Sequence, residues 1–99
     1  MDKPLIVVNF KTYETAMGDS ALTLAKAMDN FTDRDFRMIA VVSAFDLSTI
    51  SNSVSSVEVW SQHLDPVGKG SHTGWLEPDL ALHHGAVGTI INHAEHKVN

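Results

Sequence analysis

The chain has 99 residues, of which 43% are hydrophobic and 19% are charged, and its formal net charge at pH 7 is −5. This length can bury one modest hydrophobic core, so we expect one domain at most, or part of a larger one. The acidic balance and the lack of a Lys/Arg stripe argue against a nucleic-acid partner, while a small anionic ligand can still bind beside a single lysine. There is no cysteine, which excludes disulfides and thiolate chemistry.

The apolar runs of the sequence are short. The run Leu5–Val8 is much shorter than the apolar region of a signal peptide. No segment approaches the ~20 apolar residues of a transmembrane helix. The sequence therefore predicts a cytoplasmic protein without a membrane partner.

The first part of the chain alternates between strand and helix patterns. Leu5–Phe10 and Arg37–Val42 are rich in branched apolar residues, which is typical of short buried strands. Between them, Asp19 and Ser20 can cap a helix that runs to about Asn30. Its apolar stripe with helical spacing consists of Ala21, Leu24, Ala25 and Met28.

The rest of the chain continues this alternation. A weak, serine-rich helix is expected to start within Ser43–Asp46, with Leu47, Ile50 and Val54 as its inward face. A third strand follows at Val57–Ser61. The loop Gln62–Trp75 is long for a connection, which suggests a functional or interface loop. A third helix, with proline in its first turn and glycine after its end, precedes a fourth strand at Val87–Asn92. The order β-α-β-α-β-α-β predicts an α/β fold with right-handed crossovers and a parallel sheet.

Two of the predicted strands end in dense polar tips. Asn9 and Lys11 follow the first strand and point to the same face, because side chains alternate along a strand. The fourth strand runs into His93, Glu95 and His96. Since ligands bind at the carboxyl ends of parallel strands, we expect both tips to face one ligand. An ammonium and an amide suit a phosphorylated or oxyanionic substrate, and the imidazole of His93 is a candidate acid/base, electrophile or metal ligand.

Other candidate sites have less support. His93, Glu95 and His96 could bind zinc, but their order is not H-E-x-x-H and no helix is expected here. Gly68–Ser71 looks like a phosphate-binding loop, yet it fails the Walker pattern in sequence and in context. The structural alternative for Asn9 and Lys11 is a solvated strand end, and for His93 it is a core or surface histidine that is hydrogen-bonded to backbone.

Four motifs are distributed along nearly the whole chain, namely Val8–Tyr13, Gln62–Pro66, Gly70–Gly74 and Gly85–His93. In this order and spacing the sequence resembles the triosephosphate isomerase family, in particular its short archaeal form. The resemblance implies that residues 1–99 form the first half of a (β/α)8 TIM barrel. It also implies an isomerase of glycolysis and gluconeogenesis that interconverts dihydroxyacetone phosphate and D-glyceraldehyde 3-phosphate without a cofactor or a metal.

The resemblance also implies roles for individual residues. Asn9, Phe10 and Lys11 match substrate-contacting positions, and Lys11 would offset phosphate and enediolate charge. His93 matches the catalytic electrophile, a neutral imidazole that donates to the substrate oxygens. Glu95 matches a supporting carboxylate of the site.

A further motif concerns assembly rather than catalysis. The loop of Gly70, Ser71, His72, Thr73 and Gly74 matches the segment that inserts its threonine into a neighbouring subunit of the family. The resemblance therefore implies a homo-oligomer, a dimer or a tetramer, for the full-length form.

The sequence departs from the family pattern at three places. Ala94 replaces a serine that usually follows the catalytic histidine, and Ser43-Ala44 replaces a proline-containing tip. Lys97 replaces an arginine, so a planar guanidinium becomes a single ammonium charge.

The chain is also much shorter than a complete barrel. A full barrel needs about 250 residues, and the family's general-base glutamate, lid and glycine-rich phosphate loops are expected beyond residue 99. We therefore expect the 99 residues alone to be inactive.

Two other functions stay open on the sequence. One is a non-catalytic half-barrel that serves as an interaction or scaffold protein, which the replacements at Ala94 and Lys97 mildly favour. The other is a phosphate- or metal-binding module that uses Lys11, His93 and His96.

Overall fold

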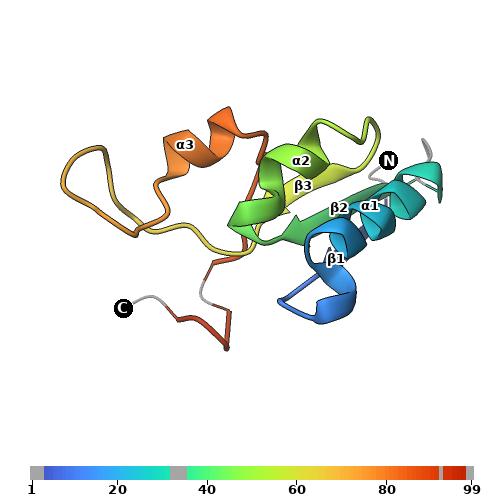
Figure 1. Cartoon of the computed structure of the whole chain (residues 1–99), viewed down its shortest axis with the longest axis horizontal. Coiled ribbons are helices and arrows are strands. Elements are labelled where there is room, and N and C mark those ends of the chain that lie inside the picture. Colours follow the sequence, from blue (N-terminus) through green and yellow to red (C-terminus); the bar gives the residue numbers. More distant parts are fainter. Residues whose placement is uncertain (1–3, 32–35, 92, 98–99) are drawn as a thin grey trace.

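The structure is a computed structural model that describes residues 4–31, 36–91 and 93–97. In this part of the chain the strands and α-helices, drawn in Figure 1, are β1 (Leu5–Asn9), α1 (Asp19–Phe31), β2 (Arg37–Val42), α2 (Leu47–Ser51), β3 (Glu58–Ser61) and α3 (Pro78–His83). Short 3-10 helices at Glu14–Ala16 and Ala44–Asp46 precede α1 and α2. This order confirms the predicted alternation of strands and helices. Within the described ranges, no helix is long and apolar enough to cross a membrane.

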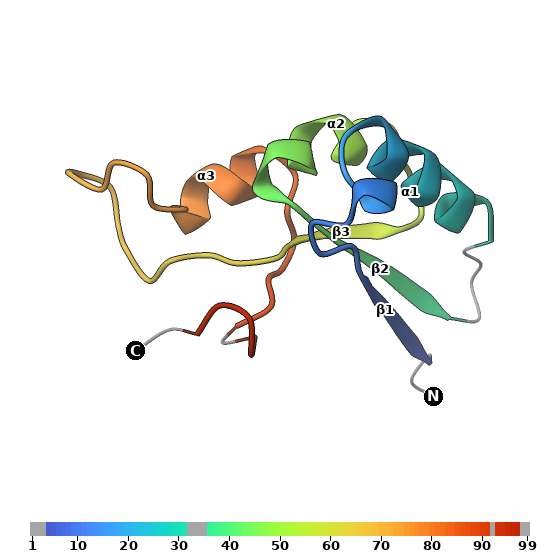
Figure 2. The same cartoon turned by 60° about the horizontal axis from the view of Figure 1, so that its bottom comes forward.

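The three strands form one parallel sheet in the order β1-β2-β3. In its register Asn9 lies beside Val41, and Val41 lies beside Trp60. Neighbours in register share a face of a sheet, so these three side chains point to one side. Figure 2 shows α1 and α2 together on one face of the sheet.

The hydrophobic core lies between the sheet and its helices. The side chains that build it alternate with those of the opposite face along each strand, which is why Phe10 is 1% exposed although it lies between two polar residues. The predicted stripe of α1 is buried apart from Leu24, which is half-buried. The main members of the core are Phe10, Ala21, Ala25, Met28, Ala40, Val42, Leu47, Ile50 and Val59.

The serine-rich second helix ends before the last of its predicted apolar positions. Leu47 and Ile50 face the core as predicted, but α2 ends at Ser51, so Val54 lies in the following turn, where it still packs against the core. Serine competes for backbone hydrogen bonds with its own hydroxyl, which favours turns over continued helix. Ser53 shows this competition, because its Oγ donates to the Thr49 carbonyl at 2.8 Å.

The predicted fourth strand differs most from the structure. The segment runs parallel beside β3, but it pairs as a strand only in one bridge, between Thr89 and Ser61. Three backbone hydrogen bonds align it: Val87 N to Val59 O, Ser61 N to Gly88 O and Ile90 N to Ser61 O. Within the described residues it has a ladder neighbour on one side only, so little holds it in extended form. Asn92, the last residue of the predicted strand, lies outside the described residues.

A close backbone approach explains the glycine in this segment. The backbone of Gly88 lies against the indole of Trp60, and a Cβ there would lie 2.4 Å from the ring. Only glycine allows the segment to pass this close to the ring. Glycine within a strand-like segment often marks such a close approach of another group to the backbone. The contact sets the path by which the chain reaches His93.

Asp29 ties the end of α1 to the entry of β3. Its carboxylate accepts the backbone N–H groups of Ser55 at 3.1 Å, Ser56 at 2.7 Å and Val57 at 2.9 Å. Burial raises the pKa of this carboxyl, but the hydrogen bonds from the three N–H donors lower it by a larger amount. The net pKa of Asp29 therefore lies below its ordinary value. The turn before β3 therefore depends on a charged acceptor from another element.

We predict that Asp29→Ala lowers the free energy of unfolding by about 1–3 kcal/mol, because three backbone donors lose their charged acceptor. The folded pKa is depressed, so this contribution is present above the unfolded pKa and is lost as the pH falls through the folded pKa. Urea unfolding of the variant and its parent should show the full difference at pH 7 and a shrinking difference below about pH 4. The control Asn30→Ala, at the neighbouring exposed position of α1, removes no charge and should show no such pH dependence. A difference for Asp29→Ala that is constant with pH would contradict the assignment.

Candidate active site

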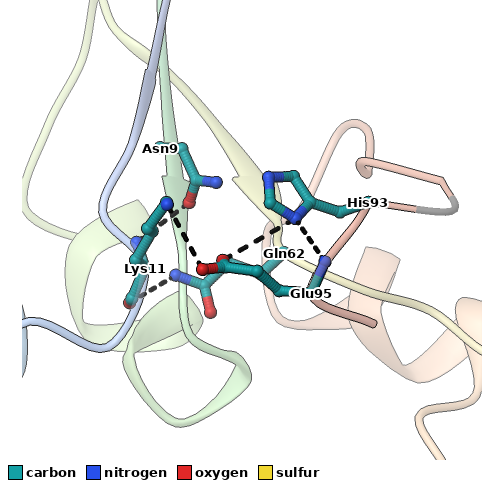
Figure 3. Close-up of polar contacts among 5 residues, drawn as sticks. All are labelled: Asn9, Lys11, Gln62, His93 and Glu95. Carbon is teal, nitrogen blue, oxygen red and sulfur yellow. Dashed lines mark hydrogen bonds and ion pairs between the residues drawn. The ribbon is translucent and has the colours of Figure 1, made fainter. Parts of the chain in front are cut away.

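A cavity of about 710 Å³ lies at the carboxyl ends of the strands. It collects both polar tips that the sequence predicts to face one ligand, together with residues of the loop after β3. Figure 3 shows five of these side chains converging from β1, from the end of β3 and from the segment near the C-terminus. The residues that carry the site are Asn9, Lys11, Gln62, His63, His93, Glu95 and His96.

Lys11 adopts an unusual backbone conformation. Its φ is +53°, and no other non-glycine residue in the described part of the chain has a positive φ. Such a conformation costs about 1–3 kcal/mol and persists only where the surroundings enforce it. The Lys11 N–H donates to Asn9 Oδ1 at 2.9 Å, which is one such constraint. Asn9 therefore shapes the strand end instead of simply facing solvent.

Gln62 supplies the second constraint on the same residue. Its Nε2 donates to the Lys11 carbonyl at 2.6 Å, and its own backbone N–H donates to the Val42 carbonyl at 3.2 Å. The side chain thus links the end of β3 to the end of β1 (Figure 3). No site role was predicted for Gln62 from the sequence. The signal that could have found it is its position directly after a strand, at the same edge as Asn9.

The Lys11 ammonium points to the second polar tip. Its Nζ lies 3.3 Å from Glu95 Oε2 and 5.8 Å from the centre of the Tyr13 ring. The hydrogen bond and the charge of Glu95, with a smaller contribution from Tyr13, raise the pKa of Lys11 above its ordinary value. The Lys11 side chain is therefore a cation at neutral pH, and its ammonium is placed to meet an anionic ligand in the cavity.

The geometry around His93 selects one neutral tautomer. The backbone N–H of Glu95 donates to His93 Nδ1 at 3.1 Å, so this nitrogen is an acceptor. The proton of the neutral ring is then assigned to Nε2, which leaves an N–H donor for a ligand. Glu95 Oε1 lies 3.7 Å from the same Nδ1, beyond hydrogen-bond distance. Glu95 thus pairs with Lys11 through its side chain and orients His93 through its backbone N–H.

A buried histidine and its partners support the floor of the cavity. His63 is 7% exposed, and its Nε2 lies 2.8 Å from Asp65 Oδ1. The other oxygen of Asp65 accepts the Leu76 N–H at 2.7 Å. The Leu76 N–H and then the His63 hydrogen bond hold the pKa of Asp65 below its usual range. The ring of His63 stacks on that of His96 with centroids 3.8 Å apart, which gives His96 a packing role that was not predicted.

The remaining predicted site residues lie elsewhere. Phe10 is in the core, so its side chain is directed away from the cavity between Asn9 and Lys11. The loop from Gly70 to Gly74 is exposed and does not line the cavity, and Figure 1 shows the connection between β3 and α3 extending away from the sheet. Among the residues that the structure describes, no group of three His, Cys, Asp or Glu is placed to hold a metal ion.

The departures from the family pattern fall at the margin of this site. Ala94 and Lys97 are exposed in the turn around Glu95. Ala44 lines the cavity, and Ser43 Oγ accepts the Phe45 N–H at 3.3 Å at the start of the 3-10 helix. None of these replacements removes a contact among Asn9, Lys11 and Glu95.

Several known proteins are similar to this chain in sequence. The family model for triosephosphate isomerase matches residues 4–99. Triosephosphate isomerase of Archaeoglobus fulgidus is 39% identical over 95 residues, which are 95% of this chain and 42% of that protein. Those of Methanothermus fervidus and Metallosphaera sedula are each 37% identical over 99 residues, which are 99% of this chain and 44% and 43% of the relatives.

The chain therefore spans less than half the length of the curated relatives it matches. Its parallel sheet with helices is consistent with the first half of an α/β barrel. The family match covers all of the described residues, so the chain belongs to the triosephosphate isomerase family.

Proposed function

We propose that this chain supplies the electrophilic and cationic half of a triosephosphate isomerase site, in a protein that interconverts dihydroxyacetone phosphate and D-glyceraldehyde 3-phosphate. The observation that carries the proposal is the pairing of two groups at one cavity. His93 is held in the tautomer that donates through Nε2, and the Lys11 ammonium is turned to the same cavity. Enolisation of a triose phosphate needs a donor for its oxygens and a cation for its phosphate.

Each residue has a distinct part in this proposal. The imidazole N–H of His93 donates to the carbonyl oxygen as negative charge develops on it during enediolate formation. The ammonium of Lys11 offsets the charge of the phosphate and of the enediolate. Asn9 and Glu95 position these two groups, Asn9 through the Lys11 N–H and Glu95 through its carboxylate and its backbone.

The reaction also requires a base that moves a proton between C1 and C2. Glu95 is the only carboxylate that lines the cavity within the described ranges, and it is paired with the Lys11 ammonium. We therefore assign the base to the part of the isomerase that these 99 residues do not match in their relatives. Among the described residues, β1 has a strand neighbour on one side only, and its Leu5 is 50% exposed. This open edge supports continuation of the sheet by such a part.

We propose a homo-oligomer for the full-length form and the cytoplasm as its location. The loop from Gly70 to Gly74 supports the first proposal, because it is exposed and belongs to the connection between β3 and α3 that extends away from the sheet (Figure 1). Trp75, at the end of this loop, is 56% exposed, which is typical of a residue that meets a partner.

We predict that a polypeptide of these 99 residues shows no isomerase turnover, because the cavity offers no free carboxylate to remove the substrate proton. A chimera that joins residues 1–99 to the part of the Archaeoglobus fulgidus relative beyond the matched segment should be active. A coupled assay for glyceraldehyde 3-phosphate measures both. Turnover by the 99 residues alone would contradict the assignment of the base, and a folded but inactive chimera would contradict the proposed function.

We predict that His93→Gln in the active chimera lowers kcat about 10²- to 10³-fold and changes KM much less, because the donor acts on charge that develops in the transition state. Steady-state kinetics with each triose phosphate provide the measurement. The matched control His83→Gln makes the same change at the exposed end of α3. It should retain activity within about twofold. Equal kcat for His93→Gln and its parent would show that His93 is not the electrophile.

A further inference from the structure

The two backbone polar groups of Lys11 are both bound by side chains of other residues. The N–H donates to Asn9 Oδ1 at 2.9 Å, and the carbonyl accepts from Gln62 Nε2 at 2.6 Å. The N–H belongs to the peptide group before Lys11 and the carbonyl to the peptide group after it, so neither peptide group can rotate without losing its hydrogen bond. The conformation at φ +53° is therefore enforced from two sides.

The contact from Gln62 differs in kind from the contact from Asn9. Asn9 is two residues away, so its bond is local and moves with the strand end. Gln62 is 51 residues away and reaches Lys11 from the end of β3. It is the contact that fixes the Lys11 backbone to the rest of the sheet.

Gln62 is itself held firmly at its base. Its backbone N–H donates to the Val42 carbonyl, and its neighbours Ser61 and His63 are 0% and 7% exposed. Ser61 Oγ donates to the His63 carbonyl at 2.7 Å, which fixes the chain on both sides of Gln62. A side chain on such a base loses little freedom when it makes one more hydrogen bond.

We propose that Gln62 is a positioning residue that acts through Lys11, by holding the strained Lys11 backbone so that the ammonium stays in the cavity beside Glu95. The inference rests on the proposed isomerase function, because the consequence of losing Lys11 is expressed in catalysis. A relaxed Lys11 with negative φ would direct its side chain along another path from the strand end. Gln62 need not touch the substrate for this role.

A double-mutant cycle in the active chimera tests the proposal. Gln62→Met keeps the length of the side chain and removes the donor, and we expect kcat/KM to fall about 10- to 100-fold, with KM rising as well as kcat falling. In a Lys11→Met background the same substitution should cost less than about twofold, because its effect runs through the lost ammonium. The control Asn30→Met removes an exposed amide from α1 and should leave kcat/KM unchanged in both backgrounds.

Two kinetic results would overturn the proposal. An equal loss for Gln62→Met in both backgrounds would mean that Gln62 acts on the substrate or on stability, independently of Lys11. No loss in the parent background would mean that Asn9 alone suffices to position the lysine. Either result leaves the isomerase proposal intact, since that proposal is judged by the turnover of the unmutated chimera.

A crystal structure of the Gln62→Met chimera decides the question without any activity. We expect the Lys11 φ to leave the positive region and Nζ to move out of the 3.3 Å contact with Glu95. An unchanged Lys11 backbone and ammonium would overturn the proposal even if the chimera were inactive. Relocation of Lys11 in an inactive chimera would uphold the role of Gln62 while the isomerase function fails.

Discussion

The candidate site depends on one backbone constraint, the left-handed conformation of Lys11. A lysine has no intrinsic preference for positive φ, so its position at the end of β1 is an energetic cost that the surrounding hydrogen bonds offset. The conformation directs the Lys11 side chain across the ends of the strands, so that its ammonium reaches Glu95. Sites that hold strain in this way stay ready for a ligand, since no further ordering is needed when it binds.

This constraint ties the site to the fold of the whole sheet. The contacts to Lys11 come from β1, from the residue after β3 and from the segment that runs beside β3. The backbone of that segment lies against Trp60 at Gly88, where a Cβ would not fit. β3 begins directly after the turn that Asp29 holds. Changes far from the cavity, in α1 or at the start of β3, therefore bear on the geometry at its centre.

The sequence predicts those features that depend on local patterns. The strand Arg37–Val42 has the predicted bounds, because a branched apolar run between polar residues suits a buried parallel strand. Asn9, Lys11, His93 and Glu95 were predicted to meet, since the ends of parallel strands share one edge. The φ of Lys11 and its bond to Gln62 were not predictable, because they oppose local preference and join residues 51 positions apart. The short pairing near Thr89 was missed for a related reason, since strand length depends on neighbours that a pattern does not reveal.

The exposure of the Lys11–Glu95 pair has a bearing on how a phosphate would enter the proposed site. The two side chains are 33% and 63% exposed, so water and salt screen their attraction and neither is locked by burial. Glu95 is bound to His93 through its backbone N–H, whereas it meets Lys11 through a flexible carboxylate. A dianionic substrate can therefore displace the carboxylate from the ammonium without disturbing the tautomer of His93. Under the proposed function, Glu95 therefore orients His93 through its backbone and releases Lys11 to the phosphate through its side chain, and the second event need not disturb the first.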